Sequence, residues 1–195
     1  MQTKTKTNLK RIKSNYSFKR TLSISIVASI LLSNQLVLAN PNTNIPKGSL
    51  PNGGKFTNGS SGSITEIAGG NKGCQGYSGC MNISGNNKNN VIAWGGGFNI
   101  GNGYKVNFEE GKNGGNNYLN LDYSKNPSKI AGLLEGNNNN IFIVNPSGVI
   151  VTETGSINAN RFVASTTPID ETTLNNFKNA NQQGKLASFS PVFKP

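Results

Sequence analysis

The titratable side chains limit the chemistry that this chain can perform. The 195 residues include no histidine and eight acids. Glu109 and Glu110 are adjacent, so on a strand their side chains would point to opposite sides and could not act together across one bond. The sequence also lacks a nucleophile motif and a Gly-rich phosphate loop. It therefore predicts a non-enzyme with no catalytic residue, no cofactor and no metal site.

The two cysteines, Cys74 and Cys80, lie in the segment Gly-Cys-Gln-Gly-Tyr-Ser-Gly-Cys. A zinc site would need further ligands, and the chain has no histidine to supply them. In an exported protein, two cysteines this close with glycines between them favour a small disulfide, worth about 2 to 3 kcal/mol on loop-entropy grounds. A pair of free thiols is the alternative.

The first 39 residues predict export from the cytoplasm. Seven basic residues and no acid are followed by an apolar run from Leu22 to Leu32. The run is too short to cross a bilayer, which takes about 20 apolar residues. A basic segment, an apolar segment and small residues up to Ala39 are typical of a signal peptide. We predict cleavage between Ala39 and Asn40, with a buried N-terminal helix as the alternative.

Removal of this leader changes the charge balance. The remaining chain has 12 basic and 8 acidic residues, a net charge of +4 in place of +11. The remaining lysines are scattered among Gly and Asn, and no basic run stands out. A nucleic-acid-binding surface is therefore not expected.

About 156 residues remain, enough for one domain, and they are rich in asparagine and glycine: the whole chain has 33 Asn and 24 Gly. Val, Ile and Phe occur in short clusters with turn-forming residues between them. This pattern predicts many short strands, in a sandwich, a barrel or a solenoid. Asparagine favours the solenoid, because Asn at a corner can bond to its counterpart one coil away. The strands are expected at residues 63–68, 81–84, 91–94, 98–100, 104–108, 118–121, 129–134, 141–144, 149–151 and 161–164.

Smaller features fill in this outline. Leu50 and Phe56 are expected to anchor an N-terminal capping segment in the core. Residues 62–65 (Gly-Ser-Ile-Thr) weakly match residues 155–158 (Gly-Ser-Ile-Asn), and residues 136–140 are expected to form a turn.

A single helix is predicted after the strands. Thr167 is expected to cap it and Pro168 to occupy its first position, with Asp170 near the positive end of the helix dipole. Leu174 and Phe177 would share the face that packs on the strands. A polar loop is the alternative.

The most informative segment is Asn145-Pro146-Ser147-Gly148, which follows the apolar run 141–144. These four residue types suit the four positions of a type I turn. In order with residues 91–94, 97–101, 104–108, 127–132, 155–159 and 162–166, the segment resembles the N-terminal secretion domain of two-partner secretion exoproteins, the filamentous-haemagglutinin-like adhesins and cytolysins of Gram-negative bacteria. The likeness covers roughly residues 48–170.

This resemblance implies an all-β fold: a right-handed parallel β-helix with an N-terminal cap and small accessory hairpins. It divides the chain into a signal peptide (1–39), the secretion domain (40–166) and a short helix with a C-terminal extension (167–195). The implied route uses the Sec machinery and then an outer-membrane β-barrel transporter, which would place the protein at the cell surface or outside, with host glycans or receptors as further partners.

The chain departs from the family pattern at two points. Ser147 replaces the second Asn of the usual Asn-Pro-Asn-Gly turn, and an Asn-Pro-Asn-Leu motif has no counterpart. Two other functions stay open at this point: the remnant of a truncated exoprotein, and a carbohydrate-binding module that uses Trp94, Tyr104 and Tyr118.

Overall fold

A computed structural model describes residues 48–111 and 115–180, which lie in the unit that spans residues 37–195. The predicted signal peptide, the cleavage site between Ala39 and Asn40 and the extension from residue 181 lie outside the described residues. The described part contains ten strands and one helix. They are β1 (Gly54–Thr57), β2 (Gly62–Ala68), β3 (Gly79–Gly85), β4 (Asn89–Trp94), β5 (Tyr104–Phe108), β6 (Asn117–Asp122), β7 (Ser128–Ile130), β8 (Leu133–Val144), β9 (Val149–Val151), β10 (Ser156–Ser165) and α2 (Glu171–Lys178).

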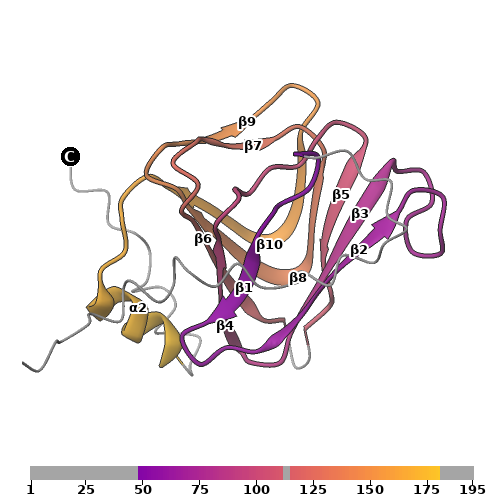
Figure 1. The fold of residues 1–195 in the computed structure, drawn as a ribbon. Coiled ribbons are helices and arrows are strands. Elements are labelled where there is room, and N and C mark those ends of the chain that lie inside the picture. Colours follow the sequence, from indigo (N-terminus) through magenta and orange to yellow (C-terminus); the bar gives the residue numbers. More distant parts are fainter. Residues whose placement is uncertain (1–47, 112–114, 181–195) are drawn as a thin grey trace, which may run out of the picture. The chain divides into compact units, whose positions relative to one another are not determined.

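Parallel pairing stacks the strands into a solenoid with three faces (Figure 1). The first face contains β3, β5 and the first parts of β8 and β10. The second face contains β4, β6 and the later parts of β8 and β10. The third face contains β7 and β9, with a bridge between Ile100 and Ile130. The four coils are residues 79–103, 104–132, 133–155 and 156–165, and the parallel β-helix predicted from the sequence is confirmed.

Two antiparallel strands cover the edge of the first coil. β1 pairs with β4, and β2 pairs with β3. Both predicted anchors of this cap contact the core, since Leu50 is buried and Phe56 is partly buried against the main cluster. The match between residues 62–65 and 155–158 is not a coil repeat, because β2 is antiparallel to β3 and β10 is parallel to β8.

Alternation along each strand builds the interior. In β5 the alternate residues Tyr104, Val106 and Phe108 are buried, whereas Lys105 and Asn107 between them are only partly so. Stacked apolar side chains from successive coils join in one cluster inside the solenoid. Each coil therefore covers the apolar surface of its neighbour, as expected for a fold stabilised by nearest-neighbour contacts.

The second face is apolar on its outer side as well. Val91, Leu119, Phe142 and Val163 are in register on consecutive coils. Phe177 of α2 packs on this column, with its ring centroid 5.9 Å from that of Phe142. The run 141–144 is therefore buried on both sides, which explains why all four of its residues are apolar.

The helix starts later than predicted. Asp170, not Thr167, is the N-cap, and its carboxylate accepts a 2.7 Å hydrogen bond from the Thr173 amide. Pro168 therefore precedes the helix. The hydrogen bond to the Thr173 amide lowers the pKa of Asp170, as expected for an ionised cap. The predicted packing face is confirmed, because Leu174 and Phe177 both join the outer apolar cluster.

Three local predictions, one of a turn and two of strands, were wrong in detail. Residues 136–140 belong to β8 and do not form a turn, and the predicted strand 129–134 is split between β7 and β8. Residues 98–100 contribute only the bridge at Ile100. The first error has a clear cause: Asn139 is fully buried, and its side chain bonds to the Glu109 carbonyl (2.9 Å) and the Asn116 amide (2.7 Å) of the preceding coil.

Candidate functional site

The Asn-Pro-Ser-Gly segment forms a turn at the end of β8. The Gly148 amide donates to the Asn145 carbonyl at 2.9 Å, and the Ser147 amide donates to the Asn145 side-chain oxygen, also at 2.9 Å. Gly148 has φ +117°, a conformation that favours glycine. Ser147 is exposed, so its substitution for Asn places no demand on packing.

Asn145 also connects three coils. Its side chain is fully buried, and its amide nitrogen donates to the Asn126 carbonyl at 2.8 Å and to the Ser128 hydroxyl at 2.9 Å, both in the second coil. Its backbone amide donates to the Ser165 carbonyl in the fourth coil at 2.9 Å. The turn therefore joins neighbouring coils, because Asn145 has hydrogen-bond partners in both the second and the fourth coil.

A buried carboxylate extends this junction to the first coil. Asp122 is 2% exposed and accepts from the Ser128 hydroxyl at 2.6 Å. It also accepts from the backbone amides of Phe98 and Ser124, at 2.8 and 2.9 Å. We call Asp122, Ser128 and Asn145 the corner network.

Sequence reasoning identified the turn but missed Asp122, Ser128 and the role of Asn126. One signal was available: the triplet Asn-Pro-Ser occurs twice, at residues 126–128 and 145–147. The two asparagines differ in the structure. Asn126 is exposed and its side chain bonds only to the nearby Ser124 carbonyl, whereas Asn145 is buried.

An asparagine ladder lies at the junction of the first and second faces. Asn117 donates to Asn89 at 2.6 Å, Asn140 to Asn117 at 2.7 Å and Asn160 to Asn140 at 2.7 Å, one rung per coil. Asn89 in turn donates to the Lys178 and Ala180 carbonyls at the end of α2. The expected amide contacts between coils are thus present, and the ladder ends on the carbonyl groups that a helix C-terminus leaves unpaired.

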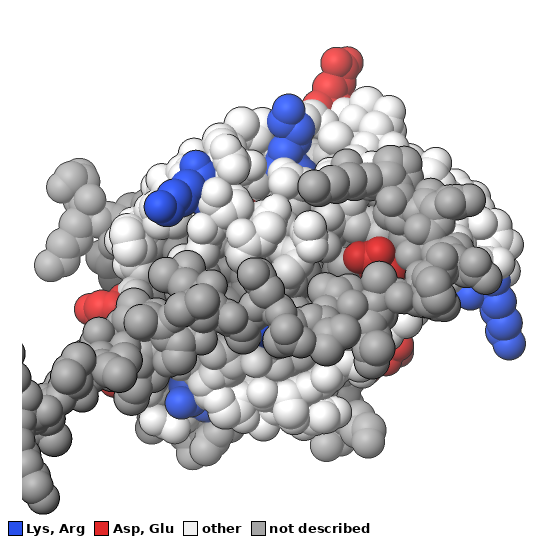
Figure 2. All heavy atoms as spheres, in the orientation of Figure 1, with Lys and Arg blue, Asp and Glu red and all other residues white. Residues whose placement is uncertain are grey.

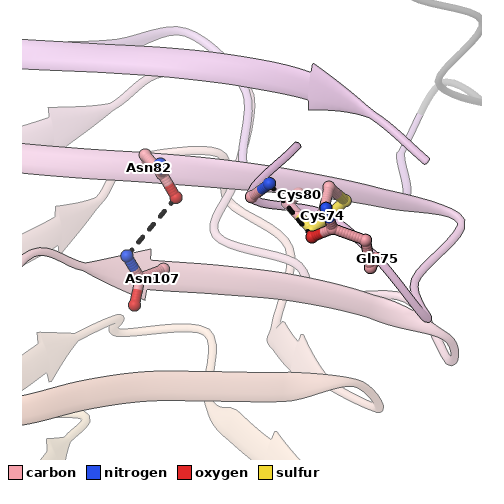
Figure 3. The surroundings of a disulfide bond; sticks show 6 residues. Cys74, Gln75, Cys80, Asn82 and Asn107 are labelled. Carbon is pink, nitrogen blue, oxygen red and sulfur yellow. Dashed lines mark hydrogen bonds between the residues drawn. A yellow bond between two sulfur atoms is a disulfide. The ribbon is translucent and has the colours of Figure 1, made fainter. Parts of the chain in front are cut away.

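Cys74 and Cys80 form a disulfide beside the first face. Cys80 is the second residue of β3, and its side chain lies on the same side of the strand as Asn82, which accepts a 3.4 Å hydrogen bond from Asn107 of β5 (Figure 3). Both cysteines are buried. The disulfide therefore ties the loop after β2 to the start of β3.

The aromatic residues considered for sugar binding are in the core. Trp94, Tyr104 and Tyr118 are 0, 7 and 1% exposed. The Trp94 indole donates to Asn120 at 3.0 Å, and the Tyr118 hydroxyl accepts from the Gly85 amide at 2.9 Å. Burial raises the pKa of Tyr118. These side chains are not available for stacking on a sugar.

The surface offers few other signs of a binding chemistry. Figure 2 shows charged side chains standing singly on the face it draws. Within residues 48–111 and 115–180, no group of three or more His, Cys, Asp or Glu residues could hold a metal ion. The same residues contain no helix that is long and apolar enough to cross a membrane.

Comparison with known proteins identifies the class of this domain. The chain belongs to the TPS (two-partner secretion) domain family, whose model matches residues 45–190. Domains of this family belong to exoproteins that are secreted or displayed at the cell surface, and the family is not one of enzymes.

Among solved structures, the HMW1 secretion domain from Haemophilus influenzae is similar to this chain, with 26% identity and a TM-score of 0.50. The match covers 64% of this chain and 29% of the other, so this chain corresponds to less than a third of that structure's length. No curated protein matches the chain.

Proposed function

We propose that this domain directs the export of an adhesin-type exoprotein through an outer-membrane β-barrel transporter and starts the folding of its β-helix at the cell surface. The observation that carries the proposal is the buried Asn145 turn, which joins three coils in a chain that belongs to the secretion-domain family. The leader over residues 1–39 would bring the chain to the periplasm through the Sec machinery, with cleavage after Ala39.

The composition suggests how the transporter recognises the chain. An Asn- and Gly-rich chain gains little by collapsing before its coils can stack, so its strands would remain available in the periplasm. Such strands can pair with the edges of sheets in the transporter's periplasmic part, as in other cases of β-strand addition. Outside, each completed coil covers the apolar side of the previous one, and this stacking opposes backward movement.

The test is export from cells that express the full chain together with its transporter. Asn145→Ala removes three side-chain hydrogen bonds, to Ser147, Asn126 and Ser128. We expect this variant to accumulate in the cells and to be lost from the medium and cell surface. Asn126→Ala is the matched control, because it changes the same residue type in the same triplet one coil earlier but removes one exposed bond. Equal export of the parent and Asn145→Ala would contradict the proposal.

The proposal also extends to binding partners on host cells. Adhesion would reside mainly in parts of the exoprotein outside this domain, and host surface glycans are the partners we would test first. A stand-alone sugar-binding role for Trp94, Tyr104 and Tyr118 is not proposed, because all three are buried.

A further inference from the structure

Asp122 is a buried carboxylate whose hydrogen-bond donors are all neutral groups. It is 2% exposed, and its three donors are the Phe98 amide, the Ser124 amide and the Ser128 hydroxyl. Among the described residues, asparagine occupies most of the buried polar positions, which include Asn89, Asn90, Asn117, Asn120, Asn139 and Asn145. A buried carboxylate at position 122 is therefore an exception among these asparagines.

The donors explain it. A carboxylate only accepts hydrogen bonds, whereas an amide presents one oxygen and one NH2 group. Ser124 donates to one oxygen of Asp122, and Phe98 and Ser128 donate to the other. An asparagine here would turn its NH2 group toward at least one of these donors. The site therefore selects a carboxylate over an isosteric amide.

The same acceptor sets the direction of the hydrogen bonds toward the turn. The Ser128 hydroxyl has one proton, which it gives to Asp122, so it must accept from Asn145. The side-chain NH2 of Asn145 therefore faces the second coil and its oxygen faces the Ser147 amide, the same orientation that the Asn126 carbonyl requires. With the amide reversed, its oxygen would face the Asn126 carbonyl and its NH2 group would face the Ser147 amide.

We propose that Asp122 is a positioning residue for the Asn145 turn: the carboxylate in the second coil holds the Ser128 hydroxyl as an acceptor, which together with the Asn126 carbonyl secures the orientation of the Asn145 amide in the third coil. This inference rests on the proposed function only in giving the turn a role in export. The orientation of the Asn145 side-chain amide is a property of the folded domain and can be tested without a transporter.

The test is native-state hydrogen exchange of the Ser147 amide in the full chain, measured by NMR relative to the Val106 amide of β5. The variants are Asp122→Asn, Ser128→Ala and the two combined. Asp170→Asn is the matched control, because it makes the same chemical change at a helix cap where Asn and Asp serve equally. If Asp122→Asn does not fold, the test proceeds with Ser128→Ala alone.

We expect Ser147 protection to fall by about tenfold or more in either single variant, as for the loss of one hydrogen bond to a charged group. The double variant should show no further fall, because both changes break the same connection. Asp170→Asn should leave the ratio unchanged. Unchanged Ser147 protection in a folded Asp122→Asn or Ser128→Ala protein, or additive losses in the double variant, would overturn the proposal. Unchanged export of Asn145→Ala would contradict the proposed function but would leave the hydrogen-exchange result standing, so the two tests fail separately.

Discussion

The asparagine ladder predicts that the same substitution costs very different amounts at different rungs. Asn117 is 1% exposed and bonds to the rungs above and below it. Asn117→Ala removes two bonds and leaves a buried oxygen on Asn89 and a partly buried NH2 group on Asn140 without partners. Each bond contributes about 1 kcal/mol and an unsatisfied buried group costs about 1 to 3 kcal/mol, so we expect a loss of about 3 kcal/mol in unfolding free energy.

The end rung provides the contrast. Asn160 is exposed and makes one ladder bond, to Asn140, so Asn160→Ala should cost below about 1 kcal/mol because water can replace the lost group. Asn107→Ala is the matched control. Asn107 also bonds to two neighbouring coils, at 3.4 Å to Asn82 and 3.1 Å to Asn137, but it is only partly buried. Its loss should be close to about 1 kcal/mol.

The assay is urea unfolding followed by the fluorescence of Trp94, the one tryptophan of the chain, which is fully buried. The m-value should stay unchanged, so that midpoints report stability. Equal losses for Asn117→Ala and Asn160→Ala, or a larger loss at Asn160, would show that the ladder does not contribute through its connections between coils.

Three further predictions concern other parts of the domain. Phe177→Ala should lower the free energy of unfolding by about 3 to 5 kcal/mol, because the ring is fully buried on the outer apolar column of the second face. Urea unfolding measures this loss, and the control Asn176→Ala, at an exposed position of the same helix, should change the free energy little. Reduction of the Cys74–Cys80 disulfide should lower the unfolding free energy by about 2 kcal/mol for so small a loop, and the double variant Cys74→Ser/Cys80→Ser should show no response to reductant. Burial raises the pKa of Glu66 in the folded state, so the ionised form is disfavoured by folding; Glu66→Gln should stabilise the domain above this pKa, and the gain should disappear as the pH falls below the unfolded-state pKa. A stability difference that grew toward acidic pH would have the wrong sign.

Much of the coil architecture could be predicted because local patterns and global packing agree. The alternation in residues 104–108 and the apolar run 141–144 correspond to β5 and the end of β8. The Asn-Pro-Ser-Gly segment contains its own turn signals, so its hydrogen bonds form within four residues.

The misses share a physical cause, which is contact between distant residues. Residues 136–140 have the composition of a turn, but Asn139 bonds to residues of the preceding coil and this extends β8. The helix cap is Asp170 and not the predicted Thr167, because the Asp170 carboxylate reaches the Thr173 amide, a contact that the residue types alone do not show. Asp122 could not be singled out, since its donors come from Phe98, Ser124 and Ser128.

We propose that this solenoid folds only after it has crossed the outer membrane. The direct measurement is protease resistance of the described domain in three samples: periplasm from cells without the transporter, periplasm from cells with it, and the exported protein. We predict rapid digestion in both periplasmic samples and a resistant fragment that contains the four coils outside the cell. A resistant fragment of the same size in the periplasm, together with normal export of that material, would contradict the account.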